Sequence, residues 1–140
     1  MRHPSAIALI AALALFTSAS VAWTHGSSTA PSAKGPTVVS PPPVKAIMLG
    51  EIIDPLCYFS HASRGPDHAA CALMCAKGGQ TLAFLEEKSG RVYSLIALGH
   101  GKNPNQPVLG VIGKRVSVKG TIYGMGKDVV LAIESAALAK

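Results

Sequence analysis

Five side chains that can bind a transition metal lie close together in this sequence. All three cysteines and two of the five histidines fall within nineteen residues. They are Cys57, His61, His68, Cys71 and Cys75, with the spacing C-x3-H-x6-H-x2-C-x3-C. Thiolate sulfur and imidazole nitrogen favour copper or zinc, whereas calcium and magnesium prefer oxygen ligands. The segment therefore predicts a Cys/His metal site, with copper as the first choice and zinc as the second.

A helix is expected to position three of these donors. Composition predicts a helix over 68–76, with Asp67 capping its start and Gly78-Gly79 ending it. Positions 68, 71 and 75 are spaced i, i+3 and i+7, so their side chains share one helix face. Only six residues separate His61 from His68, so the segment carrying Cys57 and His61 must fold back past the helix. All five donors are therefore expected to converge.

The same cysteines could instead form a disulfide, as is common in small exported domains. Cys71 and Cys75 lie one helical turn apart with parallel side chains, which is poor geometry for a mutual bond. A bridge would therefore join Cys57 with either Cys71 or Cys75. It would close a loop of about 15 residues and contribute roughly 3 kcal/mol by the chain-entropy estimate. A bridge of this kind could coexist with a His68/Cys ligand pair.

Two further groups could add metal ligands. Met74 and Met125 are thioethers that suit Cu(I). If the chain is cut after Ala22, the new terminus reads Trp23-Thr24-His25, whose amine, amides and imidazole could hold Cu(II) in a square plane. The alternative for this terminus is a disordered segment with a chance histidine. His100, between two glycines after a predicted strand, is expected to be an ordinary exposed residue.

The sequence offers no catalytic set beside the cluster. Nucleophilic catalysis would need a thiol activated by an oriented base and a substrate-binding motif, and no such motif is present. A C-x2-C redox motif is likewise absent. The pattern favours a metal-handling or metal-sensing role rather than an enzyme, with the ion and a periplasmic or inner-membrane protein as partners. A disulfide-stapled interaction module is the alternative, and thiol-redox or haem chemistry is the third hypothesis.

The first 22 residues have the three-part pattern of a secretory signal peptide. A short basic opening (1–4) precedes an unbroken apolar run (6–16), and Ser20-Val21-Ala22 supplies small residues for cleavage. The apolar run is about half the roughly 20 residues that a membrane-crossing helix needs. Cleavage is therefore expected in place of a retained anchor. The predicted location is the periplasm, with secretion or N-terminal anchoring as alternatives, and no transmembrane segment is expected after cleavage.

Composition separates a linker from one small domain. Residues 23–43 are rich in Pro, Ser and Ala and predict a flexible tether with a stiff polyproline end. The remaining residues, 44–140, suffice for one domain. The formal net charge is +6, but the lysines and arginines are scattered singly and aromatic residues make up only 5% of the chain. This pattern argues against a nucleic-acid-binding surface.

Alternating apolar residues predict five strands within the domain. The expected strands are 44–53, 81–86, 91–98, 115–123 and 128–135, with the helix after the first and an irregular crossover (103–113) before the fourth. Five short strands are most economically closed into a barrel, because closure removes exposed edges. The predicted fold class is mainly β, a small five-stranded barrel with one short helix after strand 1.

Two segments resemble small exported bacterial OB-fold domains. They are GEIID at 50–54 in the first strand and KRVSVKG at 114–120. The similarity spans most of residues 44–133 and implies an OB-like barrel. It implies little about activity, since OB-folds carry unrelated functions. The usual OB-fold helix lies between strands three and four, whereas the clearest helix here follows strand 1.

Overall fold

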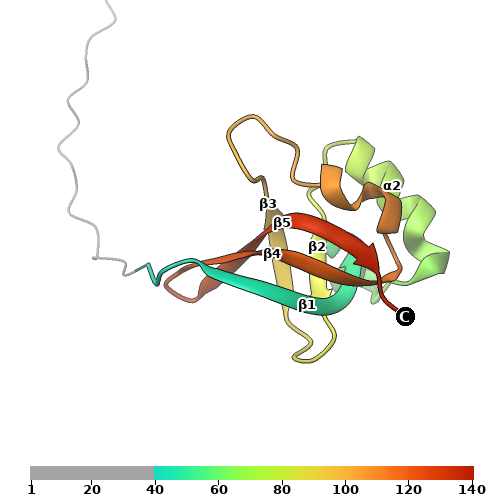
Figure 1. Cartoon of the computed structure of the whole chain (residues 1–140). Coiled ribbons are helices and arrows are strands. Elements are labelled where there is room, and N and C mark those ends of the chain that lie inside the picture. Colours follow the sequence, from blue (N-terminus) through green and yellow to red (C-terminus); the bar gives the residue numbers. More distant parts are fainter. Residues whose placement is uncertain (1–39) are drawn as a thin grey trace, which may run out of the picture. The chain divides into compact units, whose positions relative to one another are not determined.

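The computed structural model describes residues 40–140. The predicted signal peptide (1–22), residues 23–39 of the predicted linker and the Trp23-Thr24-His25 terminus lie outside the described residues. The elements, in order, are β1 (Val44–Ile53), α1 (Pro55–His61), η1 (Pro66–His68), α2 (Ala69–Lys77), β2 (Ala83–Glu86), β3 (Val92–Ile96), η2 (Gln106–Val111), β4 (Arg115–Met125) and β5 (Asp128–Leu138) (Figure 1). Within residues 40–140, no helix combines the length and apolar character needed to cross a membrane.

The five strands form a closed barrel in the order β1-β2-β3-β5-β4. Neighbouring strands are antiparallel except for β3 and β5, which run parallel. Strand β1 pairs along its length with β4 and at its C-terminal end with β2. At that corner a Cβ on Gly50 would overlap the carbonyl oxygen of Leu85, so the close approach of β1 and β2 requires glycine. The expectation of a mainly β, five-stranded OB-like barrel is confirmed.

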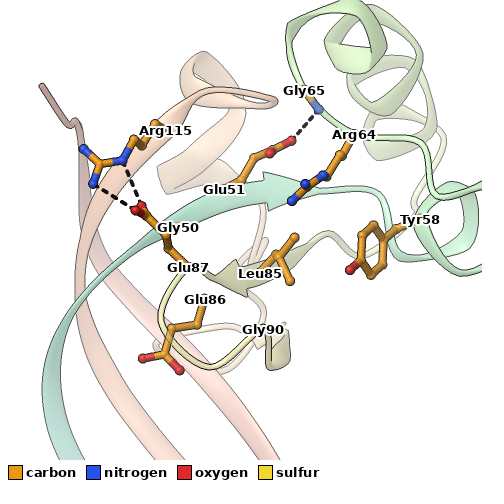
Figure 2. A pocket seen from close by; sticks show the side chains of 10 residues that line it. All are labelled: Gly50, Glu51, Tyr58, Arg64, Gly65, Leu85, Glu86, Glu87, Gly90 and Arg115. Atoms are coloured by element: carbon orange, nitrogen blue, oxygen red, sulfur yellow. Dashed lines mark hydrogen bonds and ion pairs between the residues drawn. The ribbon is translucent and has the colours of Figure 1, made fainter.

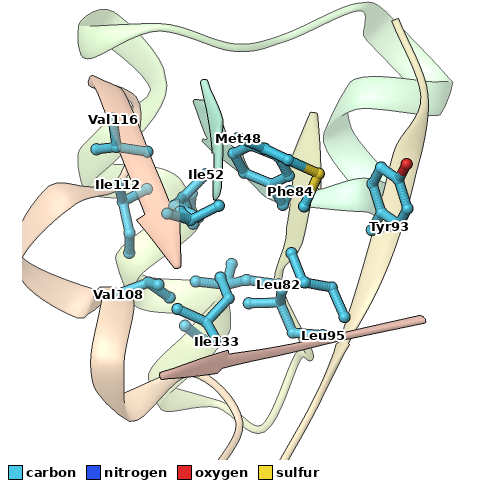
Figure 3. Packing of buried hydrophobic residues seen from close by; sticks show 14 residues of the cluster. Met48, Ile52, Leu82, Phe84, Tyr93, Leu95, Val108, Ile112, Val116 and Ile133 are labelled. Carbon is cyan, nitrogen blue, oxygen red and sulfur yellow. The ribbon is translucent and has the colours of Figure 1, made fainter. Parts of the chain in front are cut away.

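One apolar cluster fills the barrel (Figure 3). All five strands, α2 and η2 contribute to it, and Figure 3 shows the side chains converging between the strands. Its buried members are Met48, Ile52, Ala72, Ala76, Leu82, Phe84, Tyr93, Leu95, Val108, Ile112, Val116, Val118, Leu131 and Ile133. Because two members come from α2, the predicted metal-binding helix is packed onto the barrel.

The crossover between β3 and β4 is anchored by a buried asparagine. Asn105 is 3% exposed. Its Oδ1 accepts a hydrogen bond from the Leu82 backbone N–H at 2.9 Å, and its Nδ2 donates to the Gln80 carbonyl at 2.8 Å. The side chain therefore ties the crossover to the segment that joins α2 to β2.

The structure corrects the expected helices. Residues before the predicted helix form a helix of their own, α1, and the helix expected over 68–76 begins one residue later as α2. Asp67 does not cap it, because it lies inside η1 and no side chain makes the N-terminal cap of α2. The end at Gly78-Gly79 is confirmed, since α2 stops at Lys77 with Gly78 as its C-cap.

Candidate metal centre

Helix α1 starts directly at the end of β1, because Asp54 caps it. The Asp54 side chain is fully buried, and its Oδ1 accepts hydrogen bonds from the N–H groups of Leu56 at 2.8 Å and Cys57 at 3.4 Å. Pro55 occupies the first helical position, where its missing N–H costs nothing. The cap therefore fixes the backbone of Cys57 relative to the barrel.

Helix α1 packs on the outside of the sheet through one of its two aromatic residues. Tyr58 packs against a second, smaller cluster formed by Ile53, Ala83 and Leu85. Phe59, the next residue, is 71% exposed. Tyr58 alone makes this contact, because consecutive residues on a helix point in different directions.

The chain turns sharply after α1. Ala62 ends the helix in the left-handed conformation, with φ of 55° and ψ of 25°, and its N–H donates to the Tyr58 carbonyl at 2.8 Å. The following loop is tied to β1, since the Gly65 N–H donates to the Glu51 carboxylate. This loop connects α1 to η1, whose last residue is His68, and so determines where His68 lies.

Gly113, which lies between η2 and β4, allows this loop to lie close to the barrel. Gly113 has φ of +69°, and a Cβ there would overlap the Gly65 carbonyl oxygen. Its N–H donates to the Ile52 carbonyl at 3.0 Å, which holds Gly113 against β1. The position of the loop before His68 therefore depends on a residue almost fifty positions away in the chain.

Helix α2 presents its sulfur-bearing side to α1. Ala72 and Ala76, 1% and 6% exposed, pack into the barrel core. Cys71 and Cys75 lie next to these alanines in sequence and are only half-buried. Small alanines let the helix approach the barrel closely, so the cysteines are held near the end of β1 and the start of α1.

Three of the predicted donors converge. Ligand atoms of Cys57, His68 and Cys71 all lie within 4.8 Å of one another, and all three residues are half-buried. His68 Nε2 is buried and has no hydrogen-bond partner among residues 40–140. A histidine that has a buried ring nitrogen without a partner and lies beside two cysteine sulfurs is an arrangement that a bound cation would satisfy.

Cys75 and Asp54 lie beside this group. The Asp54 carboxylate, toward which the Cys75 thiol is directed, raises the pKa of Cys75 to about 11, with burial and the nearby Cys71 and Cys57 acting in the same direction. Burial, followed by the charge of Asp54, raises the pKa of Cys57. The contact with Asp54 is loose, because no donor in the described chain reaches its buried Oδ2 with full hydrogen-bond geometry.

The other predicted ligands are not part of the three-donor group. His61 is the last residue of α1 and is exposed. Met74 and Met125 are 67% and 60% exposed. His100 was expected to be an ordinary exposed residue, and it is exposed in the loop after β3. The three cysteines are free thiols, so the alternative bridge from Cys57 to Cys71 or Cys75 is not formed.

Asp54 is the site residue that sequence reasoning missed. The five predicted donors include no carboxylate, yet this one is buried against the thiols of Cys57 and Cys75. The pair Asp54-Pro55 is itself a helix-start signal, an N-cap followed by proline at the first position. Reading it would have predicted the start of α1.

A cleft of about 710 Å³ lies on the other side of the loop that leads to His68 (Figure 2). Figure 2 shows Glu51 reaching up to Gly65, and Arg115 paired with Glu87 across the β1 strand. The Arg115–Glu87 ion pair has an Nε–Oε2 distance of 2.8 Å. In this cleft, Glu51 holds the loop that contains Gly65, and Arg115 holds the turn between β2 and β3 through Glu87.

Fold and centre together define a small OB-like barrel that carries a Cys/His group close enough to bind a metal. No protein-family model, curated protein or solved structure matches this chain.

Proposed function

We propose that this protein is an exported transition-metal-binding protein that handles or senses copper. The ion is held by Cys57, His68 and Cys71. The observation that carries the proposal is the convergence of these three donor atoms within 4.8 Å. The buried, unpartnered Nε2 of His68 supports it, since an imidazole nitrogen in that state is a ready ligand.

The donor set favours copper over zinc. Two thiolates and one imidazole are soft or borderline ligands, which suit Cu(I). Zinc in a structural site takes four ligands in a tetrahedron. A fourth ligand would have to come from Cys75, Asp54 or water, so zinc is the second choice. The exposed thioethers of Met74 and Met125 are not among these ligands.

The surroundings of the donors suit an ion that must enter and leave. The three ligands, Cys57, His68 and Cys71, are half-buried. A partner protein that delivers or removes the metal can therefore reach them, although they are not fully solvated. Thiols must lose their protons to bind. The raised pKa values of Cys57 and Cys75 therefore keep these two thiols protonated near neutral pH while no metal is bound.

Competition with a chromogenic Cu(I) chelator tests the proposal. Reduced protein given one equivalent of Cu(I) should withhold it from the chelator, and the Cys57→Ser/Cys71→Ser variant should not. His68→Ala should weaken binding by at least about tenfold, as expected for loss of one of three ligands. His61→Ala and His100→Ala are matched controls that should bind normally. Retention of copper by the double cysteine variant would defeat the assignment.

Export is tested by the intact mass of protein from a periplasmic fraction. The signal sequence predicts a chain that begins at Trp23. Recovery of the full 140-residue chain in the membrane fraction alone would instead indicate a retained anchor.

A further inference from the structure

The loop between α1 and η1 is joined to the barrel by one hydrogen bond. Ala62 and Ser63 donate to carbonyl oxygens of α1, whereas the Gly65 N–H donates to the Glu51 carboxylate on β1 (Figure 2). Among residues 40–140, this is the only hydrogen bond between residues 62–65 and a strand of the barrel. The attachment of the loop to β1 therefore depends on Glu51.

Glu51 has no competing ionic partner in the part of the chain that the structure describes. Its neighbour across the β1–β4 ladder is Arg115, but Arg115 pairs with Glu87, at an Nε–Oε2 distance of 2.8 Å. A hydrogen bond from a backbone N–H to an ionised carboxylate is stronger than one between neutral groups. The half-buried Glu51 carboxylate is therefore available to hold the loop firmly.

The bond to Glu51 reaches His68 through one residue. The Gly65 carbonyl accepts a hydrogen bond from the His68 N–H at 3.1 Å, and Gly65 directly precedes η1, which ends at His68. Glu51, Gly65 and His68 thus form a continuous path of hydrogen bonds from β1 to the residue that supplies the nitrogen ligand.

Of the three ligands, His68 is the one that this path controls. Cys57 lies in α1, whose start Asp54 caps, and Cys71 lies in α2, which packs into the core. His68 precedes α2, and no side chain caps the helix there. A ring nitrogen of His68 lies within 4.8 Å of both sulfurs. If the loop were free to move, the cost of ordering it would fall on metal binding.

We propose that Glu51 is a positioning residue of the metal centre, which acts through Gly65 to hold His68 where it can bind the ion. This inference rests on the proposed function and adds to it a residue outside the three-donor group. Residues that orient metal ligands typically contribute about 10- to 100-fold to metal affinity. Glu51 acts on the backbone of His68 and not on its ring, so its contribution is expected at the lower end, about tenfold.

A double-mutant cycle on the reduced, full-length chain tests the proposal, with Cu(I) affinity measured by chelator competition. Glu51→Leu keeps the bulk of the side chain but has no acceptor, and it should weaken binding by about tenfold. In a His68→Ala background the same substitution should cause no further loss, because the ligand that it positions is already absent.

Two variants serve as controls for the loss of charge. Glu51→Gln keeps an acceptor oxygen without the charge and should bind Cu(I) like the wild type. Glu86→Ala removes another carboxylate of the same cleft, one that accepts from the Ser89 hydroxyl, and it should also bind normally. In the metal-free protein, amide hydrogen exchange at Gly65 should speed up in Glu51→Leu and not in Glu86→Ala.

The outcomes separate this inference from the proposed function. Wild-type affinity in Glu51→Leu overturns the positioning role and leaves the three-donor site intact. An equal loss with and without His68 also overturns it, since the effect would then be a general one on the fold. If the wild-type protein binds no copper, both proposals fail together.

Discussion

The reactivity of Cys75 should depend on one buried carboxylate. Asp54 is the largest cause of the raised Cys75 pKa, about 11, so Asp54→Asn should lower that pKa toward its ordinary value. Asparagine caps helices about as well as aspartate, and α1 should therefore persist. A Cys57→Ser/Cys71→Ser background leaves Cys75 as the sole thiol, so its chemistry can be followed alone.

The size of the effect follows from the thiolate fraction. At pH 8 a thiol of pKa 11 is about one part in a thousand ionised, and one of pKa 9 about one part in ten. The lower-pKa thiolate is also a weaker nucleophile, by roughly eightfold for two pKa units. Alkylation should therefore speed up by as much as about tenfold, the limit being set by the burial that remains.

Iodoacetamide labelling followed by intact mass measures this rate between pH 7 and 10. Asp67→Asn is the matched control, because Asp67 is an exposed carboxylate in η1 that does not act on Cys75. It should leave the rate unchanged. Equal labelling rates in the Asp54→Asn variant and its parent, at the same thermal unfolding temperature, would refute the placement of the carboxylate beside the thiol.

Three further predictions concern stability, measured by urea unfolding of the reduced, metal-free protein. Asn105→Ala should cost about 1–3 kcal/mol, because it leaves the Leu82 N–H and the Gln80 carbonyl without their partner; a loss below about 0.5 kcal/mol would argue against the anchor. Ala62→Gly should stabilise by about 0.5 kcal/mol, since relief of the left-handed strain exceeds the added chain entropy. Because the folded-state pKa of Cys75 is raised to about 11, its stabilising contribution is present below pH 9 and is lost as the pH rises through 11. Cys75→Ser should flatten this alkaline decline, and an unchanged pH profile would count against it.

Much of the barrel could be predicted from the sequence, because alternating apolar and polar residues indicate strands of a sheet with one buried face. Strand β1 matches its expected bounds, and the long β4–β5 hairpin extends the predicted strands by two or three residues. Strands β2 and β3 are shorter than expected, at four and five residues. Their ends depend on pairing with distant strands, which no local pattern records.

The centre was predictable in composition but not in arrangement. The spacing in the sequence predicted that Cys57, His68 and Cys71 lie together, and they do, because they are close in the chain and separated by a turn. Hydrophobicity gave no sign of α1, a seven-residue helix without a buried residue. The helix ends at Ala62 and leaves His61 exposed. This end depends on the left-handed conformation of Ala62, which cannot be predicted from an alanine in the sequence.

A shared helix face was also too weak a criterion for shared ligation. Positions 68 and 75 do lie on one side of the helical segment, but two turns apart. The burial of Asp54 is a tertiary effect that arises where β1, α1 and α2 meet, so it could not be read from spacing alone.

X-ray absorption at the copper edge, on reduced protein carrying one equivalent of Cu(I), tests the metal-binding claim most directly. The donor geometry predicts a first coordination shell of two sulfurs and one imidazole nitrogen, and the nitrogen should disappear in His68→Ala. A coordination shell of nitrogen and oxygen alone would contradict copper binding by these three residues. So would identical spectra for the wild type and His68→Ala.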